Sequence, residues 1–266
     1  MAGPTTAERG ERKQGEAPAR PPRPTGGGRR LRRPPTRVLV ITGIAVVLLS
    51  AGVVWLLYGS QWLRVERVQT SGTEVLTTQQ VRAAAEVPVG APLISVDTDG
   101  IEDRLRKRLR RIDTVVVERS WPHEIGLKVT ERKPVLLIEK GGKFVEVDAK
   151  GVQFATVARA PKGVPLLELN AAASPSLNRF GTNRLLRAAV RVAGDLPATV
   201  AKDARTVQVR SYDSISVELK GQRTVDWGSV EKGDVKAASL TALMKAEPKA
   251  ERFDVSAPTA PAVSGS

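Results

Sequence analysis

The sequence has no cysteine, a single histidine (His123) and only 4% aromatic residues. Without cysteine, the chain has no disulfides, no thiolate nucleophile and no Cys-ligated zinc. The one histidine stands beside a proline in a predicted turn, so the base of a nucleophilic triad or proton relay is missing. Zinc-protease, nucleophile-elbow, phosphate-loop and calcium-loop motifs are also absent. We therefore expect a non-enzymatic protein that binds no cofactor, metal or small-molecule substrate.

Large apolar side chains are scarce in the first 37 residues, which instead carry seven prolines and ten Arg or Lys residues against three Glu residues. A segment of this kind cannot bury a core, so residues 1–37 are predicted to be a disordered tail. The tail holds seven of the chain's 14 net positive charges. This concentration weakens the nucleic-acid interpretation that the total charge would otherwise favour. An Arg-rich tail next to a membrane span usually serves topology and contacts anionic lipid instead.

Residues 38–58 (VLVITGIAVVLLSAGVVWLLY) form a run of 21 residues without a charge. As a helix rising about 1.5 Å per residue, the run matches a hydrocarbon core about 30 Å thick. A cleaved signal peptide is the main alternative, but its apolar core is usually about 7–15 residues long and ends in small residues at the cleavage site. The sequence therefore predicts a transmembrane helix over 38–58.

The direction of this span follows from the charges that flank it. Arginines crowd the preceding segment up to Arg37, whereas only Arg64 and Arg67 fall in the twenty residues after the span. Because positive residues are retained in the cytoplasm, the N-terminus is predicted to be cytoplasmic and the rest of the chain extracytoplasmic. Interfacial positions are predicted at both ends of the span: Arg37, Trp55, Tyr58 and Trp62.

Residues 62–132 alternate in a way that predicts a small α+β unit of order β-α-α-β-β. Its first strand is expected at 63–70. Thr77 and Gln80 have the spacing of a capping box that begins a helix, and acidic residues near 97–99 suit the start of a second helix with Ile101, Leu105, Leu109 and Ile112 as its core stripe. Two strands at 114–119 and 125–131 complete the unit, with an inward set expected at Val115, Val117, Ile125, Leu127 and Val129.

The second of these helices leads into six basic residues within the eight positions 104–111. A solvated basic face is one interpretation. The other is contact with anionic lipid or an acidic partner, for which the candidate residues are Arg104, Lys107, Arg108 and Arg111.

Residues 133–258 are predicted to form a mixed β domain. Short strands at 135–139, 143–147, 152–156 and 166–169 suggest a meander, and further strands follow at 206–210, 214–219 and around 225–227. Helices are expected at 182–193 and 235–245. Residues 259–266 have little to bury and are predicted to be a disordered C-terminal tail.

The run from Arg252 to Pro258 is predicted to be the terminal strand of this domain. A terminal strand tends to lie at a sheet edge, where it can accept a strand from another protein. Its candidate partner-binding residues are Arg252, Phe253, Asp254, Val255 and Ser256. Phe253 and Val255 have an alternative role as core residues of a strand covered by its own domain.

Three segments of the 62–132 unit carry a resemblance to a known family: VERVQTSG, PVGAPLISVD and VVVERSWPHEIGLKVTERKPV. They resemble the POTRA domain of the bacterial division protein family FtsQ, also called DivIB. A short tail, a single span and an outer part of about 200 residues fit the layout of that family.

The resemblance implies a bitopic scaffold of the divisome, the protein assembly at the division septum. It implies that the distal β domain recruits small membrane proteins like FtsB and FtsL near its last strand, so that positions 253–256 correspond to that site. Two alternatives stay open: an envelope enzyme that acts on peptidoglycan with carboxylates alone, and a secretion chaperone built on POTRA repeats.

Overall fold

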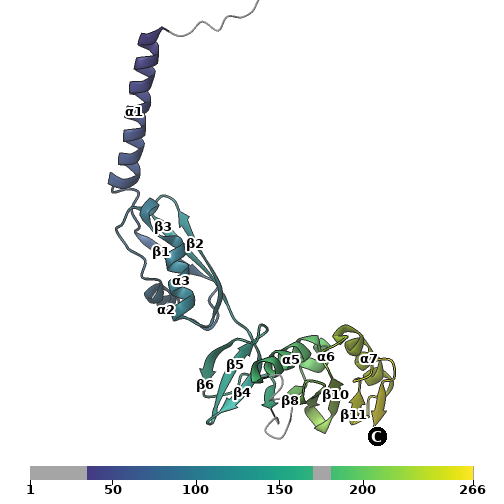
Figure 1. Ribbon diagram of the computed structural model, residues 1–266. Helices are drawn as coiled ribbons and strands as arrows, with labels where there is room; N and C mark the ends of the chain where they lie inside the picture. Colours follow the sequence, from purple (N-terminus) through teal and green to yellow (C-terminus); the bar gives the residue numbers. More distant parts are fainter. Residues whose placement is uncertain (1–34, 170–180, 266) are drawn as a thin grey trace, which may run out of the picture. The chain divides into compact units, whose positions relative to one another are not determined.

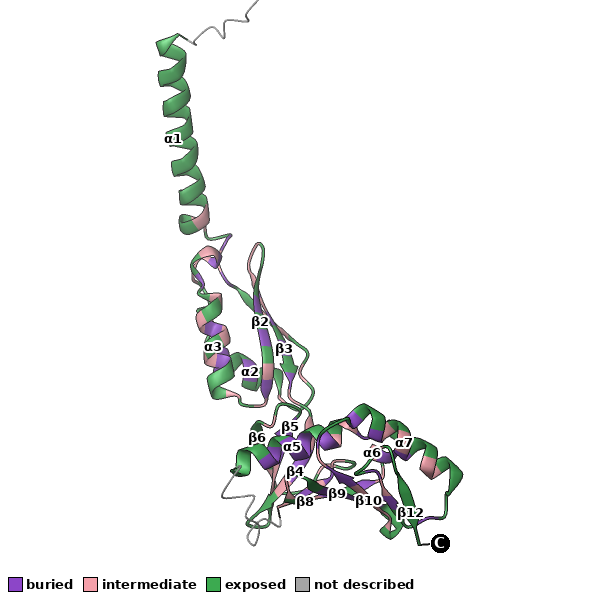
Figure 2. Ribbon diagram, turned by 45° about the vertical axis from the view of Figure 1, so that its right-hand side comes forward, coloured by how far each residue is buried: buried purple, intermediate pink, exposed green. Residues whose placement is uncertain are grey.

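The computed structural model describes residues 35–169 and 181–265. The predicted tail over 1–37 lies almost entirely outside the described residues. Helix α1 spans Thr36–Gly59, two residues longer than predicted at its start and one at its end. No residue of α1 is buried, as Figure 2 shows by its colour. Within the described part of the chain it is the one helix long and apolar enough to cross a membrane.

The first folded unit after α1 has the predicted α+β class and element order (Figure 1). Its strands are β1 (Arg67–Ser71), β2 (Ile112–Ser120) and β3 (Glu124–Glu131). Its helices are α2 (Thr78–Ala85) and α3 (Thr98–Arg108), with the 3-10 turn η1 (Leu93–Ser95) between them. In the sheet, β3 is central, parallel to β1 and antiparallel to β2.

Local signals placed the helices of this unit correctly. Thr77 accepts from the Gln80 amide (3.1 Å) and the Gln80 side chain accepts from the Thr77 amide (2.9 Å), which confirms the capping box. The predicted inward set of β2 and β3 is buried at all five positions. These side chains pack with Ile101 and Leu105 of α3 in a single core.

Two predicted boundaries in this unit are wrong. The expected strand over 63–70 begins only at Arg67, because Leu63 and Val65 bond instead to the segment that leads into η1: the Val65 amide donates to the Ala91 carbonyl (2.9 Å) and the Leu93 amide to the Leu63 carbonyl (2.8 Å). The expected helical stripe also ended too late. Helix α3 stops at Arg108, and Ile112 is the first residue of β2.

The second folded unit is a nine-stranded sheet. Its order is β12-β11-β10-β9-β8-β7-β4-β5-β6. The strands on the β6 side are β4 (Pro134–Lys140), β5 (Lys143–Asp148), β6 (Gln153–Val157) and β7 (Leu166–Leu169). The remaining strands are β8 (Ala204–Ser211), β9 (Ser214–Leu219), β10 (Thr224–Gly228), β11 (Arg252–Asp254) and β12 (Ala262–Ser264).

Among the described residues of this unit, three helices and a 3-10 turn accompany the sheet: α5 (Thr182–Asp195), α6 (Ala198–Ala201), η3 (Lys220–Gln222) and α7 (Gly233–Ala246). Helix α5 packs on β4 and β8. Its inner side chains, Leu185, Ala189 and Val192, are fully buried in the same core as Val207 and Val217. The sheet thus has one face covered by helices, as Figure 2 shows by the buried residues of α5.

The predicted meander is wrong at β7. Strand β7 lies parallel to both β4 and β8, rather than antiparallel to β6. Strand β4 therefore occupies a position between β7 and β5, and β6 is left as one edge of the sheet. A crossover of this kind depends on contacts between distant segments, which the local alternation of the strands does not encode.

Candidate functional site

The predicted partner-binding segment, Arg252–Ser256, lies near the end of the sheet opposite β6, but not at the edge itself. Strand β11 pairs in parallel with β10 and antiparallel with β12. The prediction that β11 is an edge strand is therefore wrong. The prediction of a disordered tail over 259–266 is also wrong for Ala262–Ser264, since these residues form the outermost strand, β12.

The five residues of the segment divide between the core and the surface. Phe253 and Val255 are fully buried in the core of the second unit, as the alternative interpretation anticipated. Arg252 and Ser256 are exposed, and Asp254 is partly exposed. Only Arg252, Asp254 and Ser256 therefore offer side chains to a partner.

Polar contacts hold these three side chains in place. The Arg252 Nε donates to Asp226 Oδ2 of β10 (2.5 Å), and this hydrogen bond raises the pKa of Arg252. Asp254 Oδ1 accepts from both the amide (2.9 Å) and the hydroxyl (2.6 Å) of Ser256. Arg252 and Asp254 line a shallow hollow of about 270 Å³ together with Ala262, Val263 and Ser264.

The backbone of β12 faces open space on its outer side. The Thr224 amide donates to the Glu251 carbonyl (2.7 Å) and the Val255 amide donates to the Asp226 carbonyl (3.0 Å). These bonds show that the backbone N–H and C=O of Phe253 point to β10. Because these groups alternate in direction along a strand, the N–H and C=O of Arg252 and Asp254 point to β12. Since Val263 is opposite Phe253, its N–H and C=O point outward. Among the described residues, no strand pairs with them.

The basic cluster after Arg104 is largely engaged within its own unit. The Arg104 guanidinium donates to the Ala85 carbonyl (2.5 Å), and Arg108 donates to the Glu86 carboxylate and to the Ala84 carbonyl (3.4 Å). These cations therefore compensate the C-terminal end of α2. The hydrogen bond from Arg108 also lowers the pKa of Glu86. Lys107 lies on the exposed side of α3.

Arg111 cannot contact lipid or an outside partner as predicted. Its side chain is only 14% exposed and is ion-paired with Glu146 of β5, whose side chain is 4% exposed. The guanidinium also lies over the Phe154 ring, 5.1 Å from its centroid. Arg111 follows α3 in the chain, so the helical periodicity placed it on the wrong surface.

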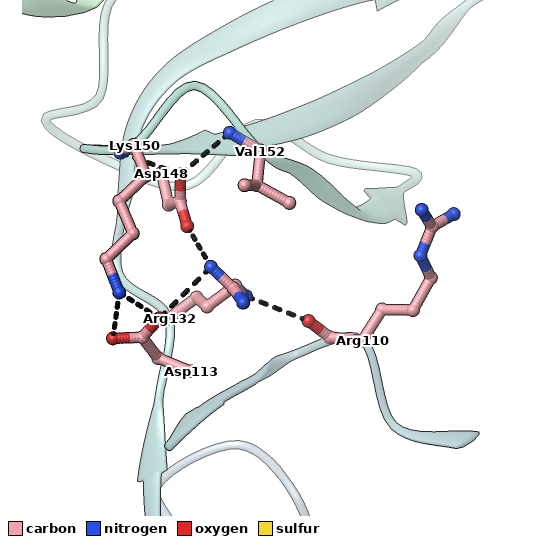
Figure 3. A network of polar contacts seen from close by, with 6 residues as sticks. All are labelled: Arg110, Asp113, Arg132, Asp148, Lys150 and Val152. Carbon is pink, nitrogen blue, oxygen red and sulfur yellow. Dashed lines mark hydrogen bonds and ion pairs between the residues drawn. The ribbon is translucent and has the colours of Figure 1, made fainter. Parts of the chain in front are cut away.

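A second partly buried arginine, Arg132, organises the link between β3 and β4 (Figure 3). It pairs with Asp148 and with Asp113 (3.1 Å), and its Nε donates to the Arg110 carbonyl (3.2 Å). Asp148 Oδ1 in turn accepts from the amides of Lys150 (2.9 Å) and Val152 (2.8 Å). The network ties the first folded unit to the β5–β6 turn of the second.

Two further buried charges, Glu131 and Lys236, were not predicted. Glu131 accepts from three successive amides, those of Glu74 (2.8 Å), Val75 (3.0 Å) and Leu76 (2.9 Å). Lys236 is 1% exposed and donates to the carbonyls of Trp227 (2.9 Å) and Ser229 (2.8 Å). Glu131 belongs to the motif VTERKP at the end of the third segment that resembles the FtsQ family, and this motif could have indicated a structural role for it. No motif in the sequence indicated that Lys236, on the buried side of α7, would be enclosed.

The predicted interfacial residues are all exposed. Arg37 lies in the first turn of α1, and Trp55 and Tyr58 lie in its last turn with exposures of 70% and 52%. Trp62 follows the helix and is 68% exposed. Amphipathic rings of this kind favour the headgroup layer.

The candidate catalytic groups of the sequence are the single histidine and the acidic residues near 97–99. Within residues 35–169 and 181–265, no group of three or more His, Asp or Glu residues could hold a metal ion. His123 Nε2 lies 2.7 Å from the Arg67 guanidinium, and Asp97 caps α3 by accepting from the Gly100 amide (3.0 Å). His123 thus contacts a neighbouring arginine from its turn, Asp97 is a helix cap, and Asp99 lies in the first turn of α3.

Comparison with known proteins gives one consistent result. Residues 63–132 match the POTRA domain, FtsQ-type. Cell division protein FtsQ of Streptomyces collinus is 63% identical over the full length of both chains, and that of Streptomyces coelicolor is 62% identical over the same extent. The FtsQ protein of Mycolicibacterium smegmatis is 32% identical over 83% of this chain and 62% of its own length.

A solved structure also resembles the chain, more distantly. It is the major extracytoplasmic domain of the trans isomer of the cell division protein DivIB from Geobacillus stearothermophilus, with 15% identity and a TM-score of 0.32, covering 44% of this chain and 94% of its own. The full-length relatives, the matched domain and the apolar helix α1 together identify a single-pass membrane protein with a C-terminal folded part. The chain belongs to the FtsQ/DivIB family of bacterial cell division proteins.

Proposed function

We propose that the chain is a non-enzymatic bitopic scaffold of the divisome. Its N-terminal tail is cytoplasmic, its folded units are extracytoplasmic, and it connects division proteins on both sides of the membrane at the septum through protein contacts. Family membership supports the division role. The arginines that precede α1 support the direction.

The open edge of β12 is the observation that carries the proposed partner site. Partners like FtsB and FtsL would add a strand beside Ala262–Ser264, because unpaired backbone groups on an edge strand are a template for strand addition. The outward N–H and C=O of Val263 would form the central pair of hydrogen bonds. The predicted site thereby moves by one strand, from β11 to β12.

The exposed residues of the predicted segment remain part of this site. Arg252 and Asp254 line the hollow beside β12, so they would contact side chains of the added strand. Phe253 and Val255 would contribute only by holding β11 in the core. The sheet edge would supply affinity and the two charged residues would supply selectivity.

A proline substitution in β12 tests this site. Val263→Pro removes the outward N–H, whereas Val263→Thr keeps the backbone and nearly the same shape. Proline is tolerated on an edge strand whose N–H faces solvent, so both variants should remain folded. We expect Val263→Pro to lose co-purification of an FtsB-like partner from membranes and Val263→Thr to retain it. Equal capture by both variants, at unchanged thermal stability, would exclude β12 as the site.

A further inference from the structure

Three exposed apolar side chains that are far apart in sequence lie on segments that backbone hydrogen bonds join at one end of the FtsQ-type POTRA domain. They are Trp62, Val89 and Trp121, with exposures of 68%, 66% and 50%. Side chains of this size are usually buried, and a group of them on a surface marks an interaction site.

Backbone hydrogen bonds fix the three segments to one another. The Gly90 amide donates to the Val65 carbonyl (2.8 Å), which brings the turn with Val89 beside the segment that follows Trp62. The Glu66 amide donates to the His123 carbonyl (2.9 Å), which brings the β2–β3 hairpin with Trp121 to the same place. The apolar group is therefore built into the fold.

Cationic groups accompany this surface. Arg64 donates to the Gly90 carbonyl (2.7 Å) and lines a hollow of about 600 Å³ together with Val89. The side chain of Arg67 is 64% exposed and pairs with Glu124 at 3.1 Å. A surface with aromatic side chains and nearby guanidinium groups suits the interface of a bilayer, where apolar contact and phosphate oxygens are available together.

The position of Trp62 in the chain favours lipid as the occupant. Helix α1 ends at Gly59, only three residues before Trp62. A chain reaches at most about 3.6 Å per residue, so Trp62 is held within about 11 Å of the end of the span. The surface to which Trp62 belongs cannot leave the vicinity of the headgroups.

We propose that Trp62, Val89 and Trp121 dock the POTRA domain on the lipid surface, with Arg64 and Arg67 contacting anionic headgroup phosphates. Of these three apolar residues, Trp62 is the one that the sequence predicted to be interfacial. The fold adds Val89 and the tip of the β2–β3 hairpin, which gives the domain three points of contact with the bilayer. The proposal holds whichever direction the span takes, so it stands or falls independently of the proposed function.

The absence of cysteine allows a direct test on the full chain in lipid nanodiscs. Val89→Cys and Ser120→Cys, the latter beside an intact Trp121, would each be labelled with the environment-sensitive dye nitrobenzoxadiazole. Val75→Cys is the matched control. Val75 is an equally exposed valine (64%) of the same domain, and it lies by Glu131 at the opposite end of β3 from Glu124.

Interfacial side chains lie about 5–10 Å deep at the headgroup boundary, so we expect lipids with spin labels near the headgroup to quench the dye at 89 and 120 about twofold more than at 75. Replacing Trp121 with serine should reduce the quenching at 120. Adding phosphatidylglycerol to phosphatidylcholine discs should increase it, and the Arg64→Gln, Arg67→Gln double variant should remove that increase.

Equal quenching at 75, 89 and 120 would overturn the proposal. It would also be overturned if the dyes at 89 and 120 became shielded only after a second division protein was added. That outcome would make this surface a protein-binding site.

Discussion

Glu131 shows how one residue of the VTERKP motif stabilises the start of the POTRA domain. Its carboxylate accepts three backbone hydrogen bonds from Glu74–Leu76 and is only 6% exposed as a residue. Bonds to a charged group are stronger than neutral ones, and their loss leaves three backbone amides unpaired. The carboxylate thus fixes the chain that leads into α2.

Glu131→Gln should therefore lower the free energy of unfolding by about 2 kcal/mol, since the amide nitrogen of Gln faces donors. The measurement is urea denaturation of the full chain. Glu124→Gln, at the other end of β3, is the control, because its partner Arg67 is exposed and the pair should contribute less than about 1 kcal/mol. A loss no larger than that of the control would show that the three bonds are unimportant.

Lys236 donates its hydrogen bonds to backbone carbonyls at a β-bulge, not to a carboxylate. The register of β9 and β10 shifts between Asp226 and Gly228, which leaves the Trp227 carbonyl outside the ladder. The Lys236 ammonium donates to that carbonyl and to the carbonyl of Ser229. Lys236→Met should lower the unfolding free energy by about 1–3 kcal/mol, because two carbonyls lose their donor.

The pH dependence of this contribution has a defined sign. Burial lowers the pKa of Lys236 below its ordinary value, with nearby Glu231 and Asp213 opposing the shift. The unfolded state then binds more protons than the folded state between the lowered pKa and the ordinary one. The stability of the wild type relative to Lys236→Met should rise as the pH increases through that window toward about 10.4. Thermal unfolding at several alkaline pH values would measure it, and a relative stability that falls would contradict it.

At the scale of elements, local signals predicted the helices well. The Thr77–Gln80 capping box and the Asp97 cap involve residues three apart in sequence, and both are present in the structure. Short-range contacts of this kind are legible because the sequence itself specifies the spacing. The same holds for the inward positions of β2 and β3, which follow a period of two.

Elements positioned by distant contacts were missed. Strand β12 is three residues long and lies in a Pro/Ala/Ser-rich segment, so its own composition does not favour a strand; pairing with β11 creates it. The parallel position of β7 and the burial of Arg111 against Glu146, 35 residues away, have the same cause. Propensity and alternation contain no information about such partners.

The link between β3 and β4 offers a test at this scale. Arg132 is partly buried and Asp148 is buried, with side-chain exposures of 16% and 7%. Arg132→Leu leaves the buried Asp148 without its cation and should cost about 3–5 kcal/mol. Lys128→Met is the control, because Lys128 and Glu118 form an exposed pair (2.7 Å) that should contribute less than about 1 kcal/mol.

Both variants can be compared by their urea midpoints. Similar midpoints would show that the network of Figure 3 does not stabilise the fold. If the loss in Arg132→Leu is due to the unpaired carboxylate, adding Asp148→Asn should restore part of it, because the amide oxygen still accepts from the amides of Lys150 and Val152.

At the scale of the whole molecule, the proposed role depends on the direction of the span. Arginines before α1 favour a cytoplasmic N-terminus, so protease added to spheroplasts should digest the part of the chain after Gly59. Detection of the C-terminal end by a tag would follow the digestion. A C-terminal part that remained intact until the membrane was permeabilised would reverse the proposed topology.

The proposed partner site requires that a partner strand pairs with the outer side of β12. Residue-resolved hydrogen–deuterium exchange of the chain with and without an FtsB-like partner measures this pairing directly, because a new interstrand bond protects the donating amide. We expect the Val263 amide to exchange rapidly in the free protein and to become protected in the complex, while the amides of β6 at the other edge are unchanged. An amide of Val263 that exchanges equally fast in the free protein and in the complex would contradict it.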